Sequence, residues 1–253
     1  MLRFKALQEK KRLVLGGSLE HALAGEYKID LRALLKEGWA LSNTNRWVMV
    51  QAVLLLVSLT IVGVLAYLKL AEIKGIEPTD PQFLMLAELG WIILSAPLFT
   101  GLIMMGINNS VGGICKPEQL FHFLPRTLVL ALTALMSGLL VELGMMLFIL
   151  PGLYLMVATS FSLPLVVEKG LTPAKAIFVS IRVINHKWRE FLLLYCLFGC
   201  LFFLSIITFG LALFWVAPFY YAVKGLLYRD IFGITVRVDI STGVQHDESV
   251  FHA

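Results

Sequence analysis

Apolar stretches long enough to cross a lipid bilayer limit the possible folds of this chain more than any other feature. A membrane-crossing helix needs about 20 apolar residues, and the first such stretch, WVMVQAVLLLVSLTIVGVLAYL, occupies residues 47–68. Hydrophobic residues make up 58% of the chain and charged residues 15%, whereas soluble domains are nearer half apolar and a quarter charged. The sequence therefore predicts a polytopic membrane protein.

Six apolar runs are separated by polar or turn-forming segments, so we expect six membrane-spanning helices. The fourth and fifth runs are short for a hydrocarbon core of about 30 Å. The expected fold class is all-α, a six-helix transmembrane bundle with interfacial amphipathic helices. A Pro151-Gly152 pair stands between the third and fourth runs, where we expect a tight external turn. The runs cover residues 47–68, 83–107, 127–149, 152–167, 191–208 and 211–227.

The distribution of lysine and arginine predicts the orientation. In a six-span layout, 19 of the 21 basic residues fall on one side, and only Lys69 and Lys74 fall on the other. Because cytoplasmic loops carry an excess of Lys and Arg, both termini are expected in the cytoplasm. The domains are then a cytoplasmic amphipathic segment (1–46), a transmembrane domain (47–228) and a cytoplasmic tail (229–253).

The first of two expected amphipathic helices beside the spans begins near Asp30. Its apolar positions alternate at helical spacing with basic ones, which predicts a helix lying on the bilayer surface or against the bundle. Disorder is expected in the tail from about Ser241 onward. Before it, Ile234, Val236, Val238 and Ile240 alternate with polar residues. That alternation is typical of a short strand, which needs a partner strand to be stable.

The second expected interfacial helix covers residues 172–190, with Thr172 as its N-cap and Pro173 at the first helical position. Its basic residues Arg182, Lys187 and Arg189 are candidate contacts for anionic lipid headgroups. Each basic residue near such a surface gains about 1 kcal/mol. Topology alone also explains a basic belt of this kind, so both interpretations remain open.

Two carboxylates, Glu88 and Glu142, fall well inside predicted spans. An acid at a helix centre costs about 2.5–3.5 kcal/mol to insert, so it is usually partnered or turned away from lipid. At 1.5 Å per residue, both lie roughly 8–11 Å below the external boundary. They are candidates for a polar intramembrane site that responds to protons or cations. The alternatives are a water-exposed vestibule, or a neutral acid bonded to Thr133 or Ser137.

The sequence offers no residue set typical of catalysis, of cofactor binding or of metal binding. Its histidines lack a spacing such as HExxH, and no serine lies in a GxSxG setting. The Gly112-Gly113 pair lacks the GxxxxGK[ST] frame of a phosphate-binding loop. We therefore expect no enzyme activity, no cofactor, no metal and no nucleic-acid partner.

Residues 139–195 carry a recognisable pattern, LLVELGMMLFILPGLYLMVATSFSLPLVVEKGLTPAKAIFVSIRVINHKWREFLLLY. It has a glycine-containing helix, a Pro-Gly break (Pro151, Gly152), a helix ending in Glu168, and a short helix containing Ser180. This pattern resembles the YciC-like group of bacterial inner-membrane proteins and is similar to the membrane region attached to some glycerophosphodiester phosphodiesterases. The resemblance implies a bacterial inner-membrane protein. It supplies no catalytic residues, so we do not expect the phosphodiesterase activity to transfer to this chain.

Two functions remain open from the sequence. The first is a non-enzymatic membrane factor that organises or stabilises envelope components or a membrane complex. Its partners would be the bilayer, including anionic lipids, and other membrane proteins or further copies of itself. The alternative is a small transporter or lipid-handling protein with a cavity near Glu88 and Glu142.

Overall fold

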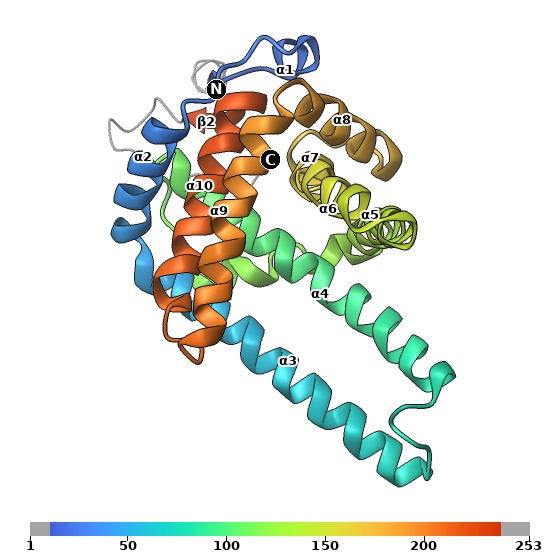
Figure 1. Cartoon of the computed structure of the whole chain (residues 1–253). Helices are drawn as coiled ribbons and strands as arrows, with labels where there is room; N and C mark the ends of the chain where they lie inside the picture. Colours follow the sequence, from blue (N-terminus) through green and yellow to red (C-terminus); the bar gives the residue numbers. More distant parts are fainter. Residues whose placement is uncertain (1–10, 239–253) are drawn as a thin grey trace, which may run out of the picture.

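The computed structural model describes residues 11–238, which are almost entirely helical (Figure 1). The first part comprises β1 (Lys11–Leu15), α1 (Leu19–Ala24), α2 (Leu31–Thr44), α3 (Arg46–Lys74) and α4 (Pro81–Ser110). Two 3-10 helices, η1 (Pro117–Phe121) and η2 (Leu124–Arg126), lead into α5 (Thr127–Leu147). The remainder comprises α6 (Ile149–Ala158), α7 (Ser162–Glu168), α8 (Pro173–His186), α9 (Trp188–Ile207), α10 (Leu213–Phe232) and β2 (Ile234–Val238).

Within the described residues, five helical segments are long and apolar enough to cross a membrane. They coincide with the first five predicted runs: α3, α4, the segment from η1 through α5, α6 together with α7, and α9. The sixth run falls in α10, which is not among the five and carries Lys224, Arg229 and Asp230. The predicted all-α fold class is therefore confirmed, and the five long apolar helices are compatible with a membrane protein.

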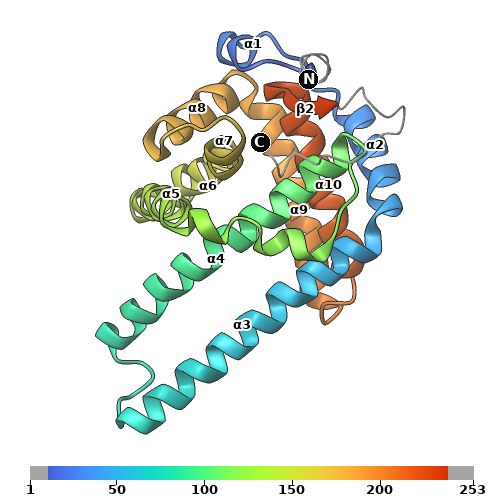
Figure 2. The same cartoon turned by 180° about the vertical axis from the view of Figure 1, so that it is seen from behind.

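Helix α10 lies at the centre of the molecule, packed against α2, α4 and α9 (Figures 1 and 2). Most of its residues from Val216 to Phe232 are buried. It crosses α4 very closely: a Cβ built on Gly225 would lie 2.1 Å from the carbonyl oxygen of Gly106. Two glycines at this crossing thus allow two backbones to touch, which places α10 inside the protein rather than at its lipid-facing surface.

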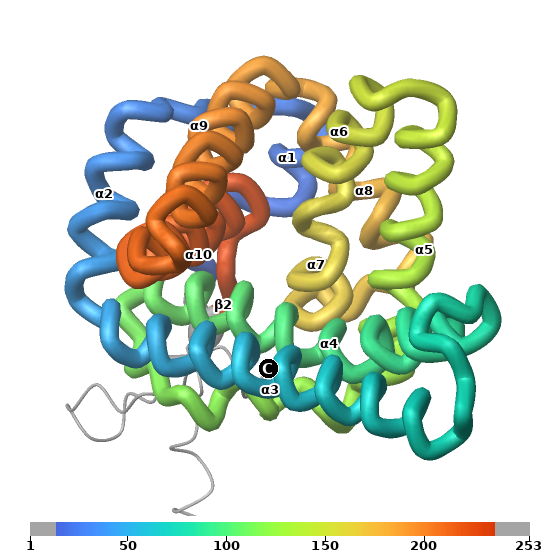
Figure 3. The backbone as a smooth tube through the Cα atoms, turned by 60° about the horizontal axis from the view of Figure 1, so that its bottom comes forward, coloured from blue at the N-terminus to red at the C-terminus, as the bar shows by residue number. Residues whose placement is uncertain are grey.

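Helices α3 and α4 form a long hairpin that extends away from the other helices (Figures 1 and 2). The rings of Tyr67 and Phe83 stack near its tip, with centroids 4.8 Å apart, and Trp91 lies beside Gly63. The other helices run in different directions: α5 is seen along its axis in Figure 1, whereas α9 and α10 lie across the view. The predicted bundle therefore has no single common axis, as Figure 3 also shows.

The turn between the third and fourth predicted spans differs from the expected one. Helix α5 ends at Leu147, Phe148 adopts an extended conformation, and α6 begins at Ile149. Pro151 and Gly152 thus lie in the first turn of α6, where a proline costs little because its missing N–H would be unpaired anyway. Gly152 serves packing instead, because a Cβ on Gly144 would lie 2.9 Å from the Cα of Gly152. The prediction of a Pro-Gly turn was wrong by three residues.

The predicted tail strand is present as β2, and its partner is β1 from the other end of the chain. The two strands are antiparallel, with Leu15 opposite Ile234 and Lys11 opposite Val238. The expected disorder from about Ser241 lies outside the described residues. The pairing fastens the N-terminal segment beside the end of α10.

The first amphipathic segment forms α2, and Asp30 caps it by accepting hydrogen bonds from the N–H groups of Arg32 and Ala33. Its apolar face packs on α10. A Cβ on Gly38 would lie 2.4 Å from a methyl group of Val223, and the Trp39 and Phe219 rings meet edge to face at 5.5 Å. Of the two predicted positions, the structure shows the one against other helices.

Candidate functional site

The two predicted intramembrane acids lie on different helices, Glu88 on α4 and Glu142 on α5, and both are exposed. Neither makes a hydrogen bond or an ion pair with another residue in the described part of the chain, and none joins the two. The hydroxyls of Thr133 and Ser137 bond elsewhere, to the Val129 carbonyl and to Ser162. The structure therefore does not bring the two acids into one polar site within a single chain.

A shallow apolar pocket lies on the inner half of the α3–α4 hairpin, between α3 and η1. It does not include either acid. Its lining residues are Leu55, Ser58, Leu59, Val62, Leu120 and Phe121.

The predicted headgroup contacts lie on α8 and at the start of α9. Arg182 and Arg189 are exposed and Lys187 is half-buried. On the opposite face of α8, the Val183 carbonyl oxygen accepts a hydrogen bond at 2.6 Å from the hydroxyl of Tyr27, which lies between α1 and α2. Thr172 occupies the N-cap position and Pro173 the first helical position, although the Thr172 side chain makes no capping bond. The three basic side chains are thus available for headgroups, and that contact stays a prediction.

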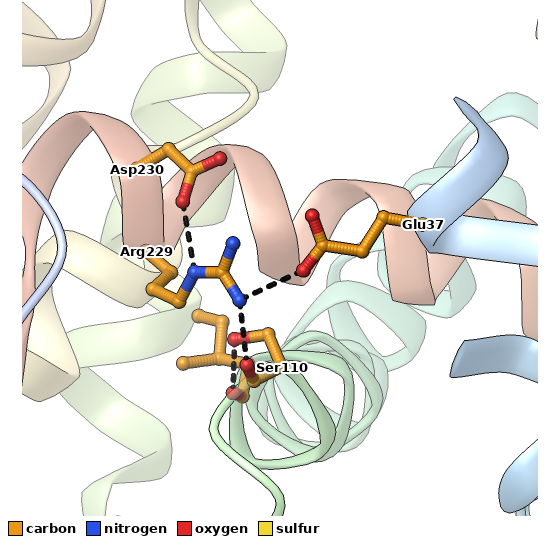
Figure 4. A network of polar contacts seen from close by, with 5 residues as sticks. Glu37, Ser110, Arg229 and Asp230 are labelled. Atoms are coloured by element: carbon orange, nitrogen blue, oxygen red, sulfur yellow. Dashed lines mark hydrogen bonds and ion pairs between the residues drawn. The ribbon is translucent and has the colours of Figure 1, made fainter. Parts of the chain in front are cut away.

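Arg229 joins three helices at the end of α10 (Figure 4). Its Nη1 donates to Glu37 Oε1 of α2 at 3.1 Å and to the Ser110 carbonyl oxygen of α4 at 2.9 Å, and its Nε donates to Asp230 at 2.8 Å. Partial burial alone would lower the pKa of Arg229, but the hydrogen bonds and charges of Asp230 and Glu37 raise it above its usual value. This junction is structural: every donor contact ends on the protein itself.

A buried ion pair fastens α7 to the same end of α10. Glu168 Oε2 lies 3.0 Å from Lys169 Nζ, with side chains only 3% and 17% exposed. The Tyr228 hydroxyl donates to Glu168 at 2.8 Å, and Lys169 donates to the Gly233 carbonyl oxygen at 2.9 Å. The charges of both residues are therefore compensated locally.

Lys224, one turn before Tyr228, has no such compensation. It is 8% exposed, and no carboxylate among the described residues lies within ion-pair distance of its Nζ. Its Nζ donates to the Tyr220 hydroxyl at 3.4 Å and lies 5.5 Å from the centre of the Tyr220 ring and 6.0 Å from that of Phe161. The Tyr195 hydroxyl lies near Lys224, Tyr220 and Ser160.

The backbone beside this lysine is irregular. The fourth candidate span is interrupted between α6 and α7, and Pro164 lies in the first turn of α7. Ser180 of α8 satisfies the interrupted backbone, since its hydroxyl donates to the Ala158 carbonyl oxygen at 2.6 Å and accepts from the Phe161 N–H at 3.2 Å. The Ser160 hydroxyl is buried, lies beside the Tyr195 hydroxyl and has no other hydrogen-bond partner among the described residues.

Sequence reasoning missed this lysine cluster because Lys224 was counted only as a basic residue at the cytoplasmic end of a span. One signal was present: Tyr220, Lys224 and Tyr228 are spaced four residues apart, which places three polar groups on one helix face. The contribution of Ser160 and Tyr195 depends on tertiary packing. No group of residues suited to holding a metal ion occurs in the described part of the chain.

Comparison with known proteins adds nothing to this geometry: no family model, no curated protein and no solved structure matches the chain.

Proposed function

We propose that this chain is a non-enzymatic integral protein of the bacterial inner membrane that organises or stabilises a membrane complex. Glu88 and Glu142 would face the membrane-spanning helices of a partner. The observation that carries this proposal is the exposure of both acids on helices suited to crossing a membrane, without a partner in the described chain.

The energetic argument starts from the cost of an acid facing lipid, about 2.5–3.5 kcal/mol near a helix centre. Glu142 lies five residues before the end of α5, and Glu88 lies one turn inside the stacked Tyr67–Phe83 pair. Both are thus roughly 8 Å inside the outer ends of their spans, at 1.5 Å per residue. A hydrogen-bond donor or a basic residue on a neighbouring helix at that depth would remove the cost.

The exposed apolar surface of the long hairpin supports the same proposal. In the most apolar 18-residue stretch of α3, only 22% of the residues are buried, whereas 67% are buried in that of α4. Such a helix is available to lipid and to other membrane helices. The bacterial inner membrane and the cytoplasmic termini follow from the family resemblance and from the distribution of basic residues. The transporter alternative gains no support, because the described pocket near α3 includes neither acid.

Site-specific photo-crosslinking in native membranes tests the proposal. A photoreactive residue replaces Met85 or Met146, which are exposed three or four residues from Glu88 and Glu142 on the same helix faces, and matched controls replace Leu86 and Leu147, which are exposed elsewhere on these helices. We expect protein adducts from the two positions beside the acids and lipid adducts only from the controls. If the partner is a second copy of this chain, coexpressed copies that carry two different tags should appear in the same adduct. Lipid adducts alone at all four positions would overturn the proposal.

Glu88→Gln and Glu88→Leu then separate hydrogen bonding from simple packing. Each variant carries a photoreactive residue on the same helix face. If the partner donates a hydrogen bond to the acid, the Gln variant should still crosslink to it in part, and the Leu variant should not. Equal crosslinking in both variants would show that the carboxylate is not the recognised group.

A further inference from the structure

Lys224 is a buried cation whose counter-ion does not come from the described chain. Glu168, which meets Tyr228 one turn further along α10, is already held by Lys169 and Tyr228. Burying an ammonium group without an anion is costly, because the desolvation is not repaid. Cation–π contacts with Phe161 and Tyr220 offset only part of that cost. The position therefore favours a bound anion.

Two tyrosine hydroxyl groups lie beside the ammonium group and add donors for an oxyanion: that of Tyr220 lies 3.4 Å from Nζ, and that of Tyr195 lies near both. The buried hydroxyl of Ser160 lies beside the Tyr195 hydroxyl and has no other hydrogen-bond partner among the described residues, so it has capacity left for a ligand. A phosphate group accepts several such hydrogen bonds at once, and bonds between charged and neutral groups are among the stronger ones.

The broken span supports the same assignment. Irregular backbone at membrane depth is tolerated where it is buried in protein or lines a cavity, and interrupted helices commonly form binding sites in membrane proteins. The break between α6 and α7 carries Ser160 and Phe161, and both belong to the lysine cluster. Ser160, Tyr195 and Tyr220 are only half-buried, so the cluster can be reached from outside.

We propose that Lys224, with the hydroxyl groups of Ser160, Tyr195 and Tyr220, forms a binding site for a phosphate group, supplied by the headgroup of an anionic phospholipid. The aromatic rings of Phe198 and Phe202 pack against Tyr220 and give the site apolar walls suited to acyl chains. An aromatic cluster alone would also accept a quaternary ammonium headgroup. Lys224 already occupies that place and repels a second cation. The proposal does not depend on the partner contacts at Glu88 and Glu142.

Lipid binding to purified, delipidated protein tests the site. Native mass spectrometry and thermal unfolding in detergent are measured with phosphatidylglycerol, with phosphatidylcholine, and with inorganic phosphate. We expect bound phosphatidylglycerol and a raised unfolding temperature, with a smaller effect of phosphatidylcholine. An equal shift by inorganic phosphate would support the phosphate site and identify its source as solution.

Lys224→Met is the decisive variant, and Lys175→Met, an exposed lysine on α8, is the matched control. We expect Lys224→Met to lose the lipid-dependent shift while remaining at least as stable without lipid, because it removes an unpaired buried charge. Tyr220→Phe should weaken binding about tenfold, as expected for one lost bond to a charged group. Full retention of the phosphatidylglycerol shift in Lys224→Met would overturn the proposal.

Discussion

Arg229 Nη1 lies 3.1 Å from Glu37 Oε1, although the two residues are 192 positions apart in the chain. The same nitrogen donates to the Ser110 carbonyl oxygen at the end of α4. One guanidinium group therefore holds the N-terminal amphipathic helix, the long hairpin and the central helix in register.

Substitutions at this junction should have unequal effects. Glu37 is half-exposed, so Glu37→Gln should cost at most about 1 kcal/mol of stability. Arg229→Met should cost about 2–3 kcal/mol, because it also leaves the Ser110 carbonyl oxygen unpaired. Thermal unfolding of the purified protein measures both, with Lys36→Gln, at an exposed residue of α2 outside the junction, as a near-neutral control. Equal losses for Glu37→Gln and Arg229→Met would show that the carbonyl contact contributes nothing.

The Glu168–Lys169 pair should behave as a buried unit. Lys169→Met alone leaves Glu168 buried with only Tyr228 and the Thr235 N–H as donors, and should cost about 3–5 kcal/mol. Adding Glu168→Gln should recover part of that loss, since it removes the uncompensated charge. Unfolding of the two single variants and the double variant gives the coupling energy directly. Additive losses would contradict a coupled pair.

The long apolar helices were predictable from the sequence because each depends on a local run of apolar residues. The role of α10 was not, because the burial of Lys224 and Gly225 depends on helices that are distant in the chain. The strand β1 was hidden in a charged segment, and only its pairing with β2 identifies it. The position of Glu88 and Glu142 along their helices followed from residue counts, but the rotation of each helix, which decides what the acids face, did not.

The α4–α10 crossing gives a sharp packing prediction. A Cβ at Gly225 would meet backbone atoms of Gly106 and Ile107 at 2.1–2.8 Å, and backbone cannot move aside as a flexible side chain can. Gly225→Ala should therefore destabilise the protein by at least about 2 kcal/mol, within the range of severe overpacking. Gly199→Ala on α9 is the matched control, because no atom lies within 4 Å of its added Cβ. It should be neutral or gain up to about 1 kcal/mol from helix propensity. Similar unfolding temperatures for the two variants would contradict the close crossing.

The hydrogen bond from Tyr27 to Val183 gives a prediction with a pH dependence. Burial, and secondly the charge of Glu190, raise the pKa of the Tyr27 hydroxyl above its ordinary value of 10.0. A raised folded-state pKa means that the neutral form is favoured in the folded protein. Its contribution to stability is then complete below pH 10.0 and declines as the pH rises through the higher folded-state value.

Tyr27→Phe keeps the ring and removes the hydroxyl that donates to the Val183 carbonyl oxygen at 2.6 Å. At neutral pH the variant should lose about 1 kcal/mol of stability, the usual value for one hydrogen bond. Above pH 10.0 the difference between the two proteins should shrink, because the wild-type contribution declines there and the variant has none to lose. Chemical unfolding at about pH 7, 9 and 10.5 measures this difference, with Tyr67→Phe as control, since half-buried Tyr67 at the hairpin tip also donates to a carbonyl oxygen, that of Pro78. A difference that grew with pH would show that the hydroxyl is stabilised in its ionised form instead, and would contradict a neutral, buried Tyr27.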